Sequence, residues 1–278
     1  MKHQVSNPGR RALIKQLGVG ALALAGFSTA PSAWAKNNDK LWKREGTDLT
    51  FKQLLKRRAF PIGKNSTGGV KGSTIHINHE LLRKAPNSEK PVPKDINIHT
   101  LCHSSIKRTD FPKWTRWYQE DGSTQVFRLF KDEHNVRNSR KNAARIEAFS
   151  HLAWERGGWH AWQGTYTVIK PHGAMIFQAK NDNNDWGVSI GLSEDGDIRL
   201  NHRRGTDKTI ARNMTGKRFT LGVRDNGHDY EVYYNKEKVG EGTYNRPNGK
   251  TKFRWGMYVG DNEVRHDAML FVTGVRLE

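Results

Sequence analysis

Hydrophobic and polar residues alternate with a period of two along most of the chain after residue 73, and residues 251–259 give the clearest example. The hydrophobic positions are Phe253, Trp255, Met257 and Val259, and the other positions are Lys252, Arg254, Gly256 and Tyr258. Successive side chains of a β-strand point to opposite faces, so this pattern predicts a strand with one buried and one polar face. The polar face then carries two cations and a phenol, with Gly256 leaving room for a ligand to approach the backbone.

The same alternation recurs in short segments separated by turn signals. Expected strands include the isoleucine pairs at positions 75 and 77 and at 96 and 98, followed by residues 124–131, 145–152, 162–170, 174–180, 186–192, 197–203, 218–225, 230–235 and 268–277. Dipeptides that favour tight turns, such as Asp195-Gly196 and Asn226-Gly227, lie between several of them. About a dozen short strands with almost no helix predict an all-β fold, a single large antiparallel β-sandwich.

Residues 36–72 differ from the rest of the chain because they are polar and basic. Thr47 or Asp48 can cap a helix whose apolar residues follow at three- and four-residue spacing, namely Phe51, Leu54, Leu55 and Ala59. We expect a short helix that packs on the main domain, followed by a loop over residues 61–72. No domain boundary is evident, so residues 36–278 form one predicted domain with an N-terminal helical extension.

The first 35 residues have the features of an export signal. Arg10 and Arg11 precede an uncharged apolar run over residues 17–27, and Ala33-Trp34-Ala35 forms a small-x-small cleavage site. The apolar run is too short to cross ~30 Å of hydrocarbon as a helix. We therefore expect a twin-arginine signal peptide over residues 1–35 and a periplasmic or secreted protein with no membrane segment after cleavage.

Basic residues strongly outnumber acidic ones. The chain has 47 Lys and Arg residues against 28 Asp and Glu residues, a formal net charge of +19, and cleavage after Ala35 would leave +15. Such a charge favours a polyanionic partner, and export favours an acidic polysaccharide over nucleic acid. Cys102 is the single cysteine, which excludes an intramolecular disulfide. We expect a soluble monomer.

Three of the predicted strands carry candidate chemistry on one face. Strict alternation places Arg145 with Glu147 on the first strand, Gln178 and Lys180 with Ile176 on the second, and Lys252, Arg254 and Tyr258 together on the third. On the second strand, Met175, Phe177 and Ala179 take the opposite face. Basic residues on a solvent-exposed strand face are common, but their coincidence on three strands favours a binding site for an anion.

The three strands resemble those of the polysaccharide lyases that have a concanavalin A-like β-jelly-roll fold, best known from alginate lyases and related to heparin and glucuronan lyases. In that family an R-x-E-x-R strand, a Q-x-H strand and a Y-F-K-A-G-x-Y strand line one concave groove. The matching residues here are Arg145 and Glu147, then Gln178, then Phe253, Gly256 and Tyr258. Phe149, Lys180 and Arg254 stand where the family has Arg, His and Lys. The resemblance spans residues 120–278 and implies a jelly roll with such a groove.

The resemblance also implies cleavage of a uronate-containing polysaccharide by β-elimination. A lyase of this kind removes the proton next to the sugar carboxylate and expels the glycosidic oxygen, which requires the carboxylate charge to be neutralised. Gln178 and Arg145 suit that neutralisation, because an amide donates hydrogen bonds and a guanidinium pairs bidentately. Tyr258, in the field of nearby cations, is the expected acid, base or both. No metal or cofactor is required.

The identity of the base stays open, because Lys180 replaces the family histidine. A histidine from another strand is an alternative base, and the candidates are His103, His151, His160, His172 and His202, with His103 included in the predicted catalytic set. The residues expected to contact substrate are Lys180, Arg254, Lys252 and Glu147, together with Arg137 and Arg140 in the loop before residue 145.

Other functions fit parts of the sequence. A non-catalytic, lectin-like protein for anionic glycans would also need cations and aromatic rings, and Trp114, Trp117, Tyr118, Trp159 and Trp162 either stack on sugars or fill the core. A jelly-roll glycoside hydrolase would need paired carboxylates, and Glu147 stands alone. Residues 181–185, Asn-Asp-Asn-Asn-Asp, offer oxygen ligands for a structural calcium ion but fit a turn better.

Overall fold

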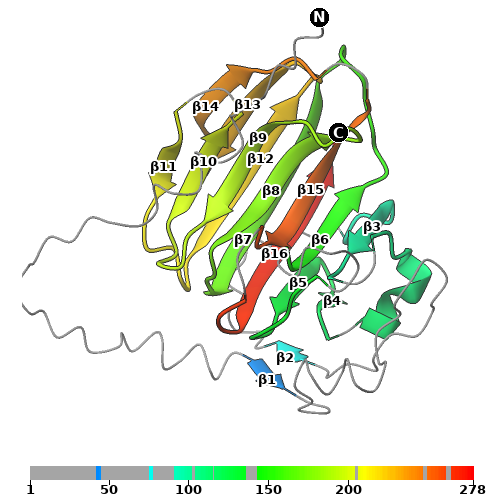
Figure 1. Cartoon of the computed structure of the whole chain (residues 1–278), viewed down its shortest axis with the longest axis vertical. Helices are drawn as coiled ribbons and strands as arrows, with labels where there is room; N and C mark the ends of the chain where they lie inside the picture. Colours follow the sequence, from blue (N-terminus) through cyan, green and yellow to red (C-terminus); the bar gives the residue numbers. More distant parts are fainter. Residues whose placement is uncertain are drawn as a thin grey trace, which may run out of the picture.

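The computed structural model describes residues 42–44, 75–77, 91–101, 104–114, 116–135, 143–203, 206–246, 249–260 and 264–278. Two seven-stranded antiparallel sheets pack against each other (Figure 1), which confirms the predicted all-β sandwich. The expected signal peptide over residues 1–35, the helix over 47–59 and the loop over 61–72 lie outside the described residues. No helix in the described part of the chain is long and apolar enough to span a membrane.

The two main sheets, here called sheet I and sheet II, contain fourteen strands. Sheet I has the order β11-β10-β9-β8-β15-β6-β3, from β3 (Ile96–His99), β6 (Arg145–Ser150), β8 (Ala174–Asn181), β9 (Trp186–Leu192), β10 (Ile198–His202), β11 (Lys208–Ala211) and β15 (Thr251–Tyr258). Sheet II has the order β14-β13-β12-β7-β16-β5-β4, from β4 (Tyr118–Asp121), β5 (Thr124–Leu129), β7 (His160–Lys170), β12 (Arg218–Asp225), β13 (Asp229–Tyr234), β14 (Glu237–Thr243) and β16 (Ala268–Leu277). The other described elements are a small sheet of β1 (Trp42–Arg44) and β2 (Ile75–Ile77) and a 3₁₀-helix, η2 (Arg108–Trp114).

The core lies between the two sheets and is formed by the hydrophobic positions of the alternating patterns. On β15, Phe253, Trp255 and Met257 are completely buried, as the pattern predicted. The indole Nε1 of Trp255 donates a hydrogen bond of 2.7 Å to Oε1 of Gln125 on β5, which connects the two sheets. Four of the five aromatic residues considered for sugar stacking are buried in the core, and the fifth, Trp159, is 42% exposed.

The alternation breaks in β8, where a bulge shifts the register between Met175 and Phe177. Met175 pairs with Tyr258 of β15, whereas Ile176 is 1% exposed and belongs to the core. The expectation that Ile176 shares a face with Gln178 is therefore wrong. The extra residue of a bulge reverses the side-chain direction beyond it, and strict alternation does not predict where a bulge falls.

Candidate functional site

Site residues predicted on three separate strands come together on the face of sheet I that points away from the core. We call this surface the polar face and define it by Arg145, Glu147, Gln178, Lys180, Lys252, Arg254 and Tyr258. The strand β15 lies between β6 and β8, and the register pairs Tyr258 with Arg145 on one side. On the other side it pairs Lys252 with Lys180. Directly paired residues of neighbouring strands point to the same side of a sheet, so the register gathers these groups.

Gln178 and Glu147 form a buried pair at the centre of the polar face. The amide Nε2 of Gln178 donates a hydrogen bond of 3.0 Å to Oε1 of Glu147, and each residue is 3% exposed. The two residues belong to β8 and β6, which are separated by β15. Glu147 pairs with Gly256 of β15 and Gln178 pairs with Arg254, so the hydrogen bond runs diagonally across β15.

Gly256 is required by the backbone. Its φ angle is 126°, a conformation that residues with a side chain rarely adopt. A Cβ atom at this position would collide with the carbonyl oxygen of Ile146 and with the ring of Phe127, which lies in the core. The sequence analysis explained Gly256 by the room that it leaves for a ligand. The structure gives a different physical reason for a glycine at this position, namely the backbone geometry of the strand.

Lys180 has an unusual electrostatic environment. Its pKa is lowered to about 8, first by burial and next by the charge of Arg254. Arg145 and Arg203 lower the pKa further, and the carboxylate of Glu147 opposes the shift. No described residue forms a hydrogen bond or an ion pair with its ammonium group. Lys180 is therefore a lysine that can lose its proton close to neutral pH.

Tyr258 and Arg145 form one end of the polar face. The Cζ atom of Arg145 lies 4.5 Å from the centroid of the Tyr258 ring, a cation–π contact. Tyr258 follows Arg254 by four residues on β15, which corresponds to about 13 Å of strand. The structure thus spreads the predicted site along the strand, with the Gln178–Glu147 pair between its two ends.

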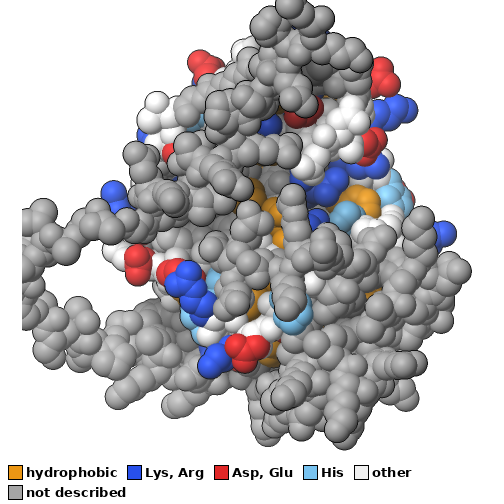
Figure 2. Space-filling model, in the orientation of Figure 1, with side chains coloured by type: hydrophobic (Ala, Val, Ile, Leu, Met, Phe, Trp, Pro, Cys, Tyr) orange, Lys and Arg blue, Asp and Glu red, His pale blue; other side chains and the backbone are white. Residues whose placement is uncertain are grey.

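The structure adds residues that sequence reasoning missed. Arg199 of β10 pairs with Gly191 of β9, which in turn pairs with Met175 in the row of Tyr258. Just after β10, the guanidinium of Arg203 lies 5.4 Å from the ring centroid of Trp186. Figure 2 shows Lys and Arg side chains, in blue, grouped beside histidine side chains in the upper right of the view. The alternation in residues 197–203 was a usable signal for Arg199, because it places the arginine on the polar side of a predicted strand.

A histidine also lies beside the buried pair. His99 of β3 pairs with Glu147, and its ring packs edge-on against Phe149 with centroids 4.3 Å apart. The alternation of isoleucines at positions 96 and 98 already implied that His99 lies on the polar side. Phe149, which occupies the position of a family arginine, is therefore part of an aromatic contact.

The other histidines considered as bases lie elsewhere. His160 begins β7 in sheet II, and its ring packs against Trp154 with centroids 4.8 Å apart. The Nδ1 atom of His202 is 2.6 Å from the hydroxyl of Tyr230 on β13, which is in sheet II. His151 follows β6 and is exposed, and its backbone N–H donates to the carbonyl of Asp95. The predicted residues His103, Arg137 and Arg140 lie outside the described residues.

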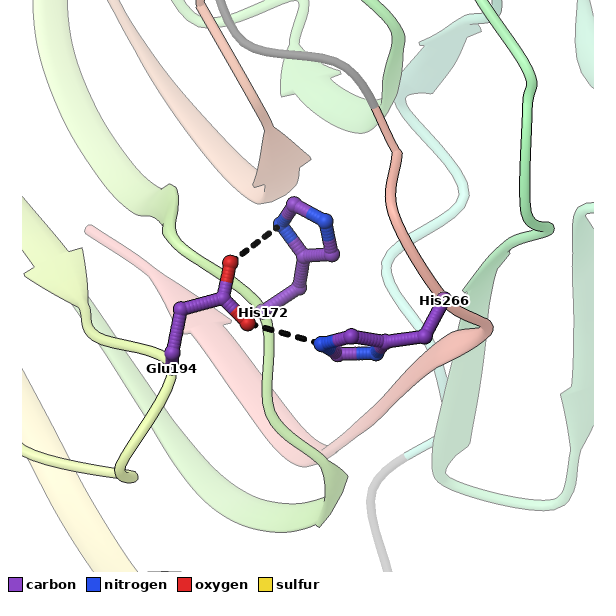
Figure 3. Close-up of side chains that lie close together, drawn as sticks. All are labelled: His172, Glu194 and His266. Carbon is purple, nitrogen blue, oxygen red and sulfur yellow. Dashed lines mark hydrogen bonds and ion pairs between the residues drawn. The ribbon is translucent and has the colours of Figure 1, made fainter.

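His172, Glu194 and His266 approach one another from three loops (Figure 3). Their ligand atoms lie within 4.8 Å of one another, and Oε2 of Glu194 is 2.7 Å from Nε2 of His266. The backbone N–H of Arg265 donates to Nε2 of His172, so the proton of this ring is on Nδ1. Both nitrogens of His266 face acceptors, the second being the carbonyl of Asp267 at 3.1 Å. These contacts connect the three loops that carry the residues.

Residues 181–185 form the turn between β8 and β9. The backbone N–H of Asp185 donates to Oδ1 of Asn181 at 2.9 Å, and the N–H of Asn181 donates to the carbonyl of Asp185 at 2.8 Å. Asn184 has a φ angle of 72°, which asparagine tolerates better than most residues. The oxygen-rich segment therefore closes a hairpin.

Comparison with known proteins supports the fold. The sequence matches no family model and no curated protein. The structure is similar to that of AlgAT5, an alginate lyase of polysaccharide lyase family 7, with 15% identity, a TM-score of 0.54, and coverage of 66% of this chain and 94% of that chain. Alginate lyase A1-II′ of family 7 and the alginate lyase from Corynebacterium sp. each show 13% identity and a TM-score of 0.55 at the same coverage. These likenesses confirm the concanavalin A-like jelly-roll fold that the three strands implied.

Proposed function

We propose that this protein is an exported polysaccharide lyase that cleaves an acidic, uronate-containing polysaccharide by β-elimination. The observation that carries the proposal is the charge of sheet I. Its strands contain six basic residues and one acidic residue, Glu147, whose carboxylate is buried against Gln178. A surface of this kind attracts a polyanion. Alginate lyases of the same fold support this substrate class, and two of their structures are complexes with substrate and with product.

The groups of the polar face suit the first step of the reaction. The proton next to a uronate carboxylate becomes acidic only when hydrogen-bond donors or cations stabilise the charge that develops on the carboxylate. The hydrogen bond to Glu147 uses one N–H of the Gln178 amide and leaves the other for substrate. Arg145 and Arg254 supply charge on either side of this pair. Glu147 is thus a positioning residue, which holds the amide in one orientation.

Tyr258 is the acid–base group in this proposal. Its phenol is on the same face as Arg145 and Arg254, and it can give a proton to the glycosidic oxygen as the bond to that oxygen breaks. The cation–π contact with Arg145 holds the ring in place. No step requires a metal ion.

The test is an assay on a panel of acidic polysaccharides. The purified protein is incubated with alginate, glucuronan, heparin, ulvan and pectin, and the ultraviolet absorbance of the unsaturated product is followed, with binding measured in parallel. We expect absorbance to rise on at least one of them. Tight binding without any rise would assign the polar face to a lectin-like protein instead, because binding needs the cations but no proton transfer.

A further inference from the structure

The outer face of sheet II contains a hollow that the function proposed above does not use. Its volume is about 290 Å³, at the lower end of the range for small-molecule sites. We call it the sheet II hollow and define it by Ala161, Gln163, Gly222, Tyr233, Lys236 and Arg276, which line it.

The register explains why these side chains share one face. It places Tyr233, Gly222, Gln163 and Arg276 in one row across β13, β12, β7 and β16. Directly paired residues of neighbouring strands point to the same side of a sheet, and Gln163 and Arg276 are exposed. The row therefore faces away from the core, so the sheet II hollow and the polar face lie on opposite outer faces of the sandwich.

Gly222, at the floor of the hollow, is not required by the backbone or by packing. Its φ angle is not in the left-handed region, and a Cβ atom there would lie 3.5 Å from the Cβ of Tyr233, an ordinary contact distance. A glycine inside a strand weakens the strand, because it has no side chain to pack. Strand glycines often mark sites where a ligand approaches the backbone closely. Gly222 keeps the hollow open although another residue would suit the strand better.

Lys236 also departs from the residue that would suit its position best. Asn235 and Lys236 form the two-residue turn between β13 and β14, with φ angles of 49° and 75°. Positive φ at both positions is typical of a type I′ turn, for which Asn followed by Gly is preferred. A lysine at the second position strains the backbone, and such strain often accompanies function. Its side chain lines the hollow, and no described residue forms an ion pair with it.

Charged and aromatic groups surround the hollow. Arg276 on β16 and Lys236 beside β13 lie on opposite sides of it, and Arg276 likewise has no ion-pair partner among the described residues. Glu278 is the only acidic residue among the described residues of the lining. The ring of Trp159, 42% exposed, lies at the rim, because its centroid is 4.9 Å from Cζ of Arg224, which also lines the hollow. Cations bind sugar carboxylates, carboxylates and amides bind hydroxyls, and rings pack on sugars.

We propose that the sheet II hollow is a second, non-catalytic binding site for the acidic polysaccharide. The inference rests on the proposed function for the identity of the ligand, but it uses no residue of the polar face. A sugar ring occupies the space between Gly222 and Tyr233, and carboxylates of the chain meet Arg276 and Lys236. The greater charge of sheet I still makes the polar face the main site. A second site holds the polymer near the protein and so raises the local concentration of substrate.

Two variants test the site because each should change stability and binding in opposite directions. Gly222→Val fills the floor with a residue that strands favour, and Lys236→Gly removes a cation and relaxes the turn. We expect the midpoint of chemical denaturation to stay the same or rise in both, while binding at the hollow weakens several-fold. The matched control is Lys238→Gln, which removes a neighbouring cation that is already compensated by Glu241 at 2.7 Å and should leave binding unchanged.

The indole N–H signal of Trp159 measures binding at the hollow itself. In protein labelled with ¹⁵N-tryptophan, the signal absent from the Trp159→Phe spectrum identifies it, and we titrate oligosaccharides prepared from the panel polysaccharide that binds best. We expect this signal to shift, with a several-fold higher midpoint in Gly222→Val and Lys236→Gly. The kcat/KM of both variants on short oligosaccharides should equal that of the wild type, because cleavage takes place on sheet I.

The outcomes separate this site from the lyase function. A Trp159 signal that stays in place while the polysaccharide is bound or cut overturns the second site and leaves the lyase function standing. Equal midpoints in the wild type and both variants place the ligand outside the hollow and also overturn it. Dextran, which is neutral, is the control ligand, and an equal shift with dextran contradicts an acidic ligand. A wild type that binds none of the acidic polysaccharides overturns both proposals.

Discussion

The two sheets of the sandwich differ in how their charges are balanced. The strands of sheet I carry six basic residues against one acidic residue, whereas those of sheet II carry six basic residues against seven acidic ones. Both sheets bury one face in the same core, so packing does not explain the difference. The charge difference indicates that sheet I is the sheet that meets a polyanion.

Several charges of sheet II are compensated by ion pairs within the protein. Nη2 of Arg246 donates to Oδ1 of Asp225 on β12 at 2.8 Å, and both side chains have no solvent exposure. At the surface, Arg224 of β12 lies 2.9 Å from Glu231 of β13. On sheet I, by contrast, Lys252 lies 3.9 Å from Asp182, and no described residue forms an ion pair with Arg254. Compensated pairs serve the fold, and we infer that the uncompensated cations serve a ligand.

The largest effect we expect from a sheet I residue is that of Tyr258→Phe. The ring and its contact with Arg145 remain, but the proton is lost, so kcat should fall by ~10²–10⁴ with folding and polysaccharide binding preserved. Product absorbance, a binding measurement and an unfolding curve on the same preparation check this. Full turnover in the variant would remove Tyr258 from the chemistry.

A sheet II residue should show the opposite behaviour. Asp225→Asn leaves the charge of Arg246 buried without its partner, and removing one partner of a buried pair costs about 3–5 kcal/mol of stability. Chemical denaturation measures this loss, and we expect turnover per folded molecule to stay close to wild type. Arg224→Gln, at an exposed pair, is the control and should cost no more than about 1 kcal/mol. Equal losses of stability in both variants would contradict the expectation that the buried ion pair contributes more to stability than the exposed one.

The salt dependence of polysaccharide binding tests the comparison between the two sheets with a smaller expected effect. Lys252→Gln removes a half-buried cation of sheet I and should weaken polysaccharide binding several-fold, by about 1 kcal/mol, and make the dependence on ionic strength less steep. Lys238→Gln on β14 of sheet II, whose ammonium is 2.7 Å from Glu241, should change neither. Titration calorimetry at two salt concentrations measures both. If the two variants bind alike, the polyanion does not lie on sheet I.

The smallest effect concerns the pKa of Lys180 in Glu147→Gln. The new amide can still accept the hydrogen bond of Gln178, but it removes the negative charge that raises the pKa of Lys180. The pKa of Lys180 should therefore fall by about one unit or less, and the pH dependence of its Cε signal in protein labelled with ¹³C-lysine measures this change. A pKa that is the same in the variant and the wild type would contradict the influence of Glu147 on Lys180.

The strands that sequence reasoning missed share one property. β1, β4, β11 and β14 were not predicted, and each lies at an edge of its sheet. An edge strand such as Glu237–Thr243 has no buried residue, so its sequence need not alternate between hydrophobic and polar positions. The central strands were predicted almost to the residue, because both their neighbours and the core constrain them.

The sequence by itself determined the sandwich, the core face of β15 and the presence of Arg145, Gln178, Lys180 and Tyr258 on polar strand faces, because alternation is a local property of a few consecutive residues. Only the tertiary structure decided that β15 separates β6 from β8, that Gln178 donates to Glu147 across β15, and that Lys180 faces cations from three elements. Strand order, bulges and the electrostatic field depend on residues far apart in the chain, and a repeating local pattern contains no information about which distant strand becomes a neighbour.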